Sequence, residues 1–417
     1  MERQHLIQII TDQQQIKLPA TLITRSIYKK IGAFIKSPQI LIITGVRRCG
    51  KSTMLQKIRS DNKENKYYLN FDDDRLINFK LEDFQTLLEL FIELFGEQKT
   101  FYFDEIQNIP EWERFIRRLH DQGHKVYITG SNATMFSKEL GTRLTGRYLQ
   151  IEMYPFSFIE FANFKNPAII ISKTKTTLEK GLLKKLFNQF FTCGGIPEFI
   201  IRKEISYLEM LYESVLYRDI IVKYKINDRA IKELVLYLAS NVSKEITYNS
   251  LRSLLGVGSA NTVADYCEYL QESFLCFFIN RYDFSLKKQL HFAKKIYFID
   301  QAVAQVVGFR ISEDRGRILE NIVFLELKRR YKNIYFHRQR CECDFLIKEG
   351  LHITMAIQVC VQLNSDTTRQ RELEGLIEAL NMYNLKEGYI ITENEETTEK
   401  IEHFTIHVIP IWKWLLN

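Results

Sequence analysis

Long apolar runs, low-complexity tracts and internal repeats are all missing from this sequence of 417 residues. No uninterrupted apolar stretch is long enough to cross a bilayer, which excludes a membrane-spanning helix. The opening residues contain no apolar core followed by a small-residue cleavage site, so they do not form a secretion signal. We therefore expect a folded protein of the cytoplasm that has no membrane partner.

Cysteine is too sparse and too scattered for a disulfide framework or a zinc site. The seven cysteines, an odd number, lie between Cys49 and Cys360. Cys341 and Cys343 have no second ligand pair to complete a zinc site. We interpret all seven as reduced thiols. The net charge of +7 is mild for this length, so it permits nucleic-acid binding without predicting it.

The chain is too long for one hydrophobic core, and its length predicts roughly two to four domains. Between Gln39 and Tyr154, short β-branched or aromatic runs alternate with helical stretches. This alternation predicts a parallel sheet with helices on both faces, so we expect an α/β domain at residues 1–154. Its expected strands are ILIIT (40–44), KYYLNF (66–71), TFYFDE (100–105), KVYITG (125–130) and RYLQIEM (147–153).

Three further regions follow Pro155. Residues 155–226 have helical spacing of apolar positions and indicate a helical lid or linker. Residues 227–300 read as helices around the turn GVGS (256–259) followed by two strands, the outline of a winged helix. Residues 301–417 combine helices and strands in a second α/β unit.

The stretch from Gly45 to Ser52 fits the phosphate-loop pattern G-x-x-x-x-G-K-[ST], and it lies between an apolar strand and a helical stretch. Backbone N–H groups of such a loop bind the β-phosphate of a nucleotide, and the helix N-terminus adds partial positive charge. Lys51 is expected to reach the β- and γ-phosphates, and the Ser52 hydroxyl to ligate Mg²⁺. The predicted nucleotide-binding residues are Gly45, Val46, Arg47, Arg48, Cys49, Gly50, Lys51, Ser52 and Thr53.

Two acids end the strand TFYFDE. Asp104 is expected at the carboxyl edge of the sheet beside the phosphate loop, where it can hold Mg²⁺ through water. Glu105 is then the candidate general base, because a carboxylate there can orient and deprotonate an attacking water. The simpler alternative is a surface strand that happens to end in two acids.

Polar residues near the next two strands complete the candidate site. Ser131 and Asn132, after KVYITG, are candidates for sensing the γ-phosphate or positioning the water, or they are an ordinary helix cap. Arg143 and Arg147 precede the last strand and are candidates for neutralising transition-state charge on this chain's or a neighbour's nucleotide. We favour Arg147, with a solvated or ion-paired arginine as the alternative.

With these residues the chain resembles the AAA-like ATPases of bacteria and archaea that carry a C-terminal nuclease-like domain of unknown function. The resemblance implies an ASCE-type P-loop core that uses ATP and Mg²⁺, with the catalytic glutamate on the strand that carries Asp104. No guanine-reading N-K-x-D stretch is present, in agreement with ATP. The resembling pieces include GVRRCGKST (45–53), YFDEIQNIPEWE (102–113), YPFSFIEF (154–161), CGGIPEF (193–199), KIYFID (295–300), ILENIVFLEL (318–327) and CDFLI (343–347).

The winged-helix region offers a possible DNA contact. The expected recognition helix, 258–272, would bury Val263, Tyr266 and Leu270, but its outer face is polar rather than basic. The expected wing concentrates bases that can contact phosphates, and protein contact or dimerisation is the alternative role. These bases are Arg281, Lys287, Lys288, Lys294 and Lys295.

The C-terminal region resembles the PD-(D/E)xK nucleases, in which a helix Glu, a strand Asp and an E-x-K pair surround Mg²⁺. The matching positions are Glu320, Asp344 and Gln358, with Cys360 where the lysine would stand. A thiol does not replace the cation that stabilises the developing charge. Rescue by Lys328 or Lys348 is not favoured, so we expect a degenerate nuclease fold with a vestigial metal site.

Three hypotheses follow. The first is an Mg²⁺-dependent ATP hydrolase that acts as a switch or motor coupled to DNA. The second is a regulatory switch whose nucleotide state sets assembly with a protein partner or with copies of itself. The third is an ATP-dependent nuclease, which we favour least.

Overall fold

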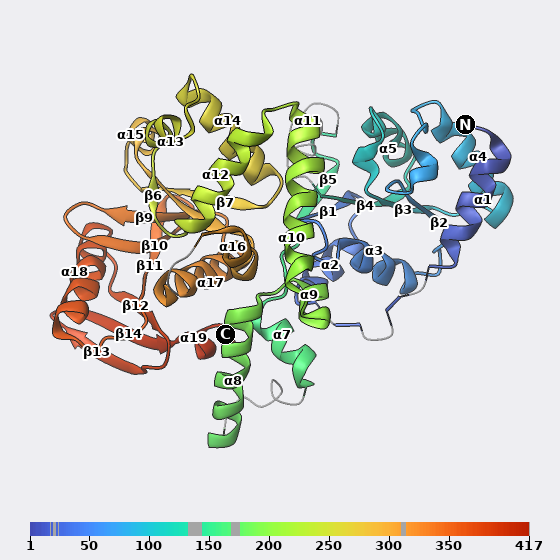
Figure 1. The fold of residues 1–417 in the computed structure, drawn as a ribbon. Coiled ribbons are helices and arrows are strands. Elements are labelled where there is room, and N and C mark those ends of the chain that lie inside the picture. Colours follow the sequence, from blue (N-terminus) through green and yellow to red (C-terminus); the bar gives the residue numbers. More distant parts are fainter. Residues whose placement is uncertain are drawn as a thin grey trace. The chain divides into compact units, whose positions relative to one another are not determined.

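The computed structural model describes residues 1–416 except 17, 20, 21, 24, 132–143, 168–175 and 310–313. It divides into two compact units (Figure 1). Unit 1 comprises Met1–Tyr154 with Glu272–Phe274, and unit 2 comprises Pro155–Gln271 with Leu275–Asn417. Within the described residues, none of the helices combines the length and apolar character needed to cross a membrane. All seven cysteines are free thiols.

Unit 1 is built on a five-stranded parallel sheet in the order β2-β3-β4-β1-β5. Each strand lies within one residue of its expected limits, because short apolar runs bounded by polar residues define buried strands well. The order places β4 between β1 and β3, so the carboxyl ends of these three strands are neighbours. The strands are β1 (Ile40–Thr44), β2 (Tyr67–Asn70), β3 (Thr100–Asp104), β4 (Lys125–Gly130) and β5 (Tyr148–Glu152).

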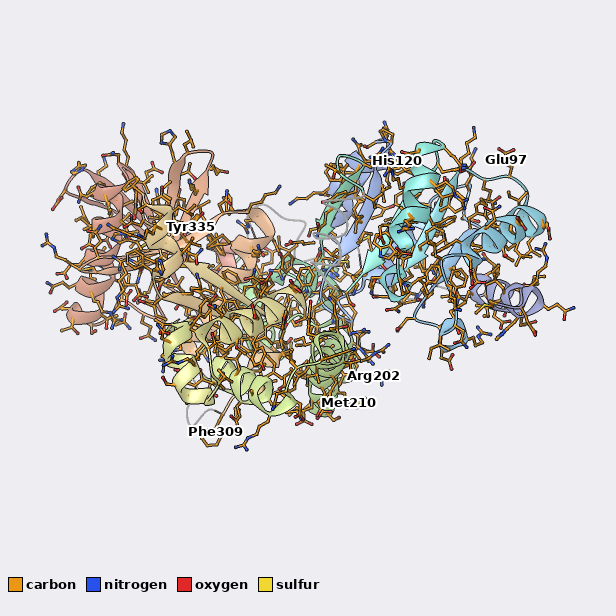
Figure 2. All side chains as sticks on the ribbon, turned by 90° about the horizontal axis from the view of Figure 1, so that it is seen from above. Glu97, His120, Arg202, Met210, Phe309 and Tyr335 are labelled. Atoms are coloured by element: carbon orange, nitrogen blue, oxygen red, sulfur yellow. The ribbon has the colours of Figure 1, made fainter. Side chains whose placement is uncertain are left out.

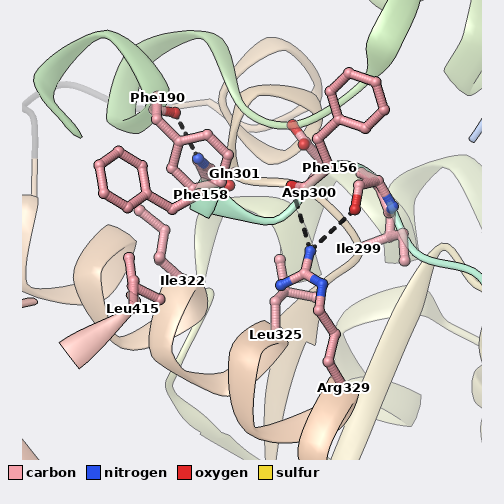
Figure 3. A pocket seen from close by; sticks show the side chains of 11 residues that line it. Phe156, Phe158, Phe190, Ile299, Asp300, Gln301, Ile322, Leu325, Arg329 and Leu415 are labelled. Carbon is pink, nitrogen blue, oxygen red and sulfur yellow. Dashed lines mark hydrogen bonds between the residues drawn. The ribbon is translucent and has the colours of Figure 1, made fainter. Parts of the chain in front are cut away.

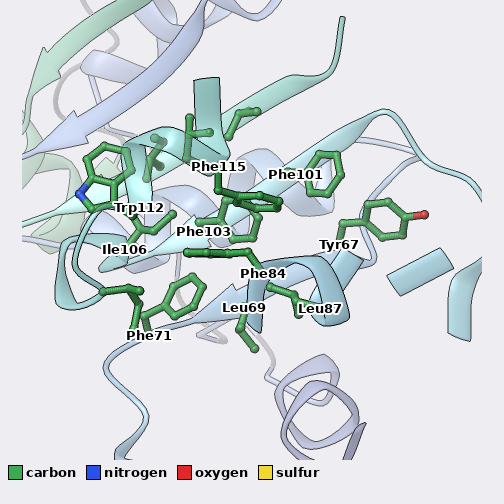
Figure 4. Close-up of a cluster of buried hydrophobic side chains, with 14 of the residues drawn as sticks. Tyr67, Leu69, Phe71, Phe84, Leu87, Phe101, Phe103, Ile106, Trp112 and Phe115 are labelled. Carbon is green, nitrogen blue, oxygen red and sulfur yellow. The ribbon is translucent and has the colours of Figure 1, made fainter. Parts of the chain in front are cut away.

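Helices cover both faces of this sheet, as the alternating pattern predicted. One face carries a core rich in aromatic residues, in which Phe84 stacks on Phe115 with ring centroids 4.3 Å apart (Figure 4). The first helix, which the sequence reading did not single out, buries Leu6, Ile9 and Ile10 in the same core. The α-helices among the described residues of unit 1 are α1 (Arg3–Gln14), α2 (Ile27–Ile35), α3 (Lys51–Ser60), α4 (Asp83–Phe95) and α5 (Trp112–Asp121).

Unit 2 begins with the helical region that the sequence predicted. Two of its helices have capping boxes at their starts, α7 from Ser157 with Glu160 and α8 from Thr176 with Glu179. A π-helical segment, Val215–Ile221, connects the last two helices. The helices are α7 (Phe158–Lys165), α8 (Thr177–Cys193), α9 (Pro197–Arg202), α10 (Ile205–Ser214) and α11 (Val222–Tyr224).

The next region carries a small antiparallel sheet in the order β6-β8-β7. The expected wing is not a plain hairpin, because the helix α15 (Leu286–His291) lies between its two long strands. Val263, Tyr266 and Leu270 are buried as expected. The elements are α12 (Asp228–Ser240), β6 (Glu245–Ile246), α13 (Tyr248–Leu255), α14 (Ala260–Glu272), β7 (Cys276–Asn280), α15, β8 (Lys294–Phe298) and α16 (Gln301–Val307).

The C-terminal part of unit 2 is a mixed six-stranded sheet in the order β13-β14-β12-β11-β10-β9. It has its own core, in which Leu376 and Leu380 pack with Leu346 and Ile390. The short strand β13 and the last helix were not predicted. The elements are α17 (Arg315–Arg330), β9 (Ile334–Arg338), β10 (Glu342–Glu349), β11 (His352–Val359), α18 (Asp366–Met382), β12 (Glu387–Thr392), β13 (Thr397–Ile401), β14 (Phe404–Pro410) and α19 (Ile411–Trp414).

Three of the sequence pieces without an assigned chemistry meet around Gly195. Its carbonyl accepts a hydrogen bond from the Phe156 N–H at 2.7 Å, and its own N–H donates to Asp300 Oδ2 at 2.6 Å. A Cβ at Gly195 would lie 2.3 Å from the Phe156 carbonyl oxygen. Arg329 donates to the carbonyl of Pro155 in the same place (Figure 3). YPFSFIEF, CGGIPEF and KIYFID therefore form one packing junction of unit 2.

Candidate active site at the edge of the unit 1 sheet

The loop between β1 and α3 folds back against the chain that leaves β5. Gly45 has a φ of 153°, and a Cβ there would lie 2.1 Å from the Met153 carbonyl oxygen, so this position accepts only glycine. The Cys49 thiol donates to the same carbonyl at 3.3 Å. Gly50, with a φ of 101°, precedes the first turn of α3. The loop is thus a closed backbone turn at a helix N-terminus, the geometry that binds phosphate.

Arg25 connects this loop to the chain that follows β5. Its guanidinium donates to the Cys49 carbonyl at 2.8 Å and to the Tyr154 carbonyl at 2.6 Å, and the residue is 8% exposed. Two buried charge-assisted hydrogen bonds hold the loop and the end of β5 at a fixed separation. Arg25 is a positioning residue that the sequence reading missed.

The predicted metal-binding pair is brought together at the carboxyl edge of the sheet. The Ser52 hydroxyl, at the start of α3, donates to Asp104 Oδ1 at 3.2 Å. Asp104 ends β3 and is 1% exposed, and it also accepts a hydrogen bond from the hydroxyl of Thr129 on β4. A hydroxyl and a carboxylate are oxygen donors, so this set fits Mg²⁺, which keeps water and phosphate oxygens as its other ligands.

Glu105 has an unusual backbone conformation. Its φ of 49° and ψ of 41° place it in the left-handed region, which residues other than glycine rarely adopt. Its N–H donates to Thr129 Oγ1 at 3.0 Å, so β4 holds the strained residue in place. Its carboxylate accepts a hydrogen bond from Gln107 Nε2 and lies 3.4 Å from Lys51 Nζ.

The charges of this group follow from burial and pairing. Burial, and then the neighbouring Glu105 carboxylate, raise the pKa of Asp104 to about 6. Burial is the largest influence on Glu105 and opposes its ionisation, but the Lys51 ammonium, the Gln107 hydrogen bond and the Arg47 charge together outweigh it and lower the pKa of Glu105. For Lys51, burial favours the neutral amine, yet Glu105 raises its pKa above the ordinary value. Lys51 and Glu105 therefore form a charged pair at neutral pH.

Arg147 is not part of this group. It precedes β5, where Tyr148 pairs with Ile40 at the start of β1, and its Nε donates to Asp121 Oδ1 at 2.9 Å. It thus lies at the amino edge of the sheet, about 13 Å of strand from the phosphate loop. The expectation that Arg147 acts on this chain's own nucleotide is wrong, whereas action on a neighbour's nucleotide stays a prediction. Asn132 and Arg143 lie outside the described residues.

The predicted nuclease-like residues lie in unit 2, around an unexpected lysine. Lys295, on β8, contacts Glu320 on α17 and Asp344 on β10. It is 1% exposed, so the expectation that it contacts DNA from the wing is wrong. Gln358 uses its amide oxygen to accept the Asp344 N–H at 3.1 Å. Among the residues that the structure describes, no three acidic, histidine or cysteine side chains are arranged to hold a metal ion.

Three domain families and two full-length relatives resemble this chain in sequence. Residues 37–162 match the AAA domain, and residues 184–313 and 315–414 match two domains of unknown function, DUF8612 and DUF4143. "Uncharacterized protein MJ1544" of Methanocaldococcus jannaschii is 37% identical over 98% of this chain and 95% of its own length. The chain belongs to the family of that protein. Through its AAA domain the chain is an AAA-family P-loop ATPase. A second relative, an uncharacterized protein of Haemophilus influenzae, shares 30% identity over 91% of this chain and 94% of its own length.

Solved structures are only remotely similar. The structure of the Thermotoga maritima RuvB Holliday junction branch migration motor matches 62% of this chain and 92% of its own chain, at 15% identity and a TM-score of 0.33. A signal transduction ATPase with a tetratricopeptide repeat sensor, PH0952 of Pyrococcus horikoshii, matches 75% of this chain and 47% of its own, at 16% identity and a TM-score of 0.28. Scores this low support no argument about the role of the chain.

Proposed function

We propose that the protein hydrolyses ATP with Mg²⁺ at the carboxyl edge of the unit 1 sheet. The observation that carries the proposal is that Thr129 bonds both acids, accepting from the Glu105 N–H and donating to Asp104. One residue thereby fixes a candidate metal-binding carboxylate and a candidate base relative to the phosphate loop. Such fixed geometry is the main contribution a protein makes to phosphoryl transfer.

The roles divide by chemistry. Backbone N–H groups from Gly45 to Thr53 bind the phosphates, and Lys51 leaves Glu105 to pair with the β- and γ-phosphates. Ser52 and Asp104 would hold Mg²⁺, which neutralises phosphate charge when bound. Glu105 orients and deprotonates the attacking water, and Gln107 holds its carboxylate by a hydrogen bond. The left-handed backbone at Glu105 supports this role, because strained residues concentrate at functional sites.

We further propose that ATP hydrolysis is coupled to DNA through unit 2, with less basic surface than the sequence suggested. Lys295 is buried, and Lys294 is half-buried and donates to Asn280. Lys287 and Lys288 are exposed in the segment between β7 and β8, and Arg281 is half-buried. A strip of this kind would contact phosphates rather than read bases.

A second candidate is a switch that acts on a protein partner. The same wing exposes three large apolar side chains, Phe284 at 74%, Leu286 at 69% and Leu290 at 62%. Other exposed apolar side chains of unit 2 include Met210 and Phe309 (Figure 2). Apolar side chains grouped on one short segment favour protein contact over phosphate contact.

Steady-state ATP hydrolysis, measured with and without duplex DNA at several salt concentrations, tests both parts. Lys51→Ala should abolish binding or turnover, because Lys51 is the only lysine of the loop sequence GVRRCGKST (45–53). DNA coupling predicts stimulation that fades as salt is added, since phosphate contacts release counterions. A basal rate that DNA leaves unchanged at every salt concentration would reject DNA coupling and favour the protein partner. The absence of any turnover in the wild type would reject the ATPase itself.

A further inference from the structure

Lys295 is a fully enclosed lysine at the centre of the nuclease-like part of unit 2. Its side chain is 2% exposed and projects from β8 among three carboxylates. Its Nζ lies 3.0 Å from Glu320 Oε1, 2.8 Å from Asp344 Oδ1 and 2.6 Å from Glu342 Oε1. Hydrogen bonds to Glu320 and Asp344 use two of the three N–H groups of the ammonium, and Glu342 adds an ion pair.

The surrounding groups complete a closed network. Tyr297, two residues further along β8, donates its hydroxyl to Glu320 Oε1 at 2.7 Å. The second oxygen of Asp344 accepts the Val359 N–H at 2.9 Å. Glu342 is the most exposed of the three acids and also lies 3.4 Å from Arg338. Each charged group therefore has a partner, which is the condition for keeping charges in a protein interior.

The lysine stays charged in this place. Burial alone would favour the neutral amine, but Asp344 and Glu320 raise the pKa of Lys295 well above its ordinary value. Burial, and then the Asp344 charge, raise the pKa of Glu320. The Lys295 ammonium is thus charged, whereas burial and the neighbouring Asp344 charge oppose the ionisation of Glu320.

The resemblance to nucleases implies a metal ion between the helix glutamate and the strand aspartate, and these residues do not fit one. The ammonium already bonds both carboxylates. Gln358 does not supply a third oxygen, because its carbonyl accepts the Asp344 N–H and its NH₂ donates to Glu372. Cys360 lies in the apolar core of this sheet and supplies no cation.

We propose that the Lys295 ammonium is the resident cation of this site and stands where a divalent metal ion would need to bind. Glu320 and Asp344 are accordingly a cation site that the chain fills with its own side chain. Removal of the ammonium should leave these carboxylates with two fixed oxygens and no counter-charge, a set suited to a hard divalent cation. The neighbouring Lys294, on the same strand, serves as a matched control because it donates to Asn280 and contacts none of the three acids.

The test is Mn²⁺ binding to the nucleotide-free full chain, followed by calorimetry and by the shift of the melting temperature. Wild type and Lys294→Ala should not bind Mn²⁺ at the unit 2 site, so Asp344→Asn should leave the Mn²⁺ binding of both unchanged. Lys295→Ala should gain a site at least about tenfold tighter, and Mn²⁺ should raise its melting temperature more than that of the wild type. Asp344→Asn in the Lys295→Ala background should remove the gain.

Terbium luminescence gives a second readout at the same place, because Tyr297 bonds Glu320 and can transfer excitation to a bound ion. Lys295→Ala should show tyrosine-excited emission that the wild type lacks. A folded Lys295→Ala with no gain in either readout overturns the proposal. Wild-type Mn²⁺ binding that Asp344→Asn abolishes also overturns it, and this arm decides the matter if Lys295→Ala does not fold. The ATPase assay is independent of these outcomes, since Lys51 and Glu105 lie in unit 1.

Discussion

Lys51 Nζ lies 3.4 Å from Glu105 Oε1, with side chains that are 3% and 12% exposed. The lysine that is expected to bind phosphate is thus paired with the carboxylate that is expected to activate water. Nucleotide binding should draw Lys51 away from Glu105, because phosphate oxygens compete with this carboxylate for the Lys51 N–H donors, one of which already goes to the Val46 carbonyl. Glu105 therefore competes with the nucleotide for Lys51, and it holds the Lys51 side chain in place when no nucleotide is bound.

Glu105→Gln should separate binding from turnover. Loss of the general base should lower kcat by about 100-fold or more, since positioned bases contribute about 10²–10⁴-fold. Nucleotide affinity should stay the same or rise, because the neutral amide releases Lys51 and no longer repels phosphate. Calorimetric ATP binding and a phosphate-release assay check the two parts. Glu97→Gln, an exposed position of the same unit, is the control. Normal turnover by Glu105→Gln would remove Glu105 as the base.

Thr129→Val should reduce turnover although we assign Thr129 no role in proton transfer, because its hydroxyl bonds Asp104 and the Glu105 N–H. The methyl replaces the hydroxyl that accepts from the Glu105 N–H and donates to Asp104, while the volume of the side chain is kept. Both acids then lose their common tether, so we expect a fall in kcat of about 10- to 100-fold, with ATP affinity changed less. Thr129→Ser, which keeps the hydroxyl, should recover most of the rate. An unchanged rate in Thr129→Val would show that the tether is not needed.

The pH dependence of kcat/KM should report Asp104. Its pKa is raised to about 6, mainly by burial, and its ionised form is the one that can hold Mg²⁺. Activity should therefore be full above about pH 7 and fall as pH drops through about 6, reaching about one-tenth at pH 5. The Thr129 hydrogen bond lowers this pKa, so Thr129→Val should move the fall to higher pH. A profile that is flat between pH 5 and 7 would contradict the assignment.

Whether a site residue could be predicted from the sequence depended on its position relative to a strand. Lys51, Ser52, Asp104 and Glu105 could be found because they follow strands, and the carboxyl ends of parallel strands share one edge. The same rule argues against Arg147, since a residue that precedes a parallel strand lies at the opposite edge. Thr129 was not predicted, because it lies within the apolar run of β4, where a threonine is an ordinary strand residue.

Lys295 shows what a single sequence cannot supply. Lys294 and Lys295 are adjacent lysines on one strand, so their side chains point to opposite faces. Nothing local says which face will be covered by α17 and β10, which follow later in the chain. The same holds for Arg25, whose two carbonyl partners lie 24 and 129 residues away. Long-range packing decides such positions, whereas periodicity decides the elements themselves.

Gly195→Ala should destabilise unit 2 because no side chain fits there. The new Cβ would lie 2.3 Å from the Phe156 carbonyl oxygen. The two backbone segments cannot move apart to make room without losing the 2.7 Å hydrogen bond from the Phe156 N–H to the Gly195 carbonyl. We expect a loss of about 2–4 kcal/mol in the free energy of unfolding. Gly181→Ala is the control, since a Cβ there meets nothing within 4 Å on an exposed turn of α8. It should instead stabilise by about 0.5–1 kcal/mol. Urea unfolding of the full chain measures both changes, and equal stability of the two variants would contradict the tight packing of Gly195 against Phe156.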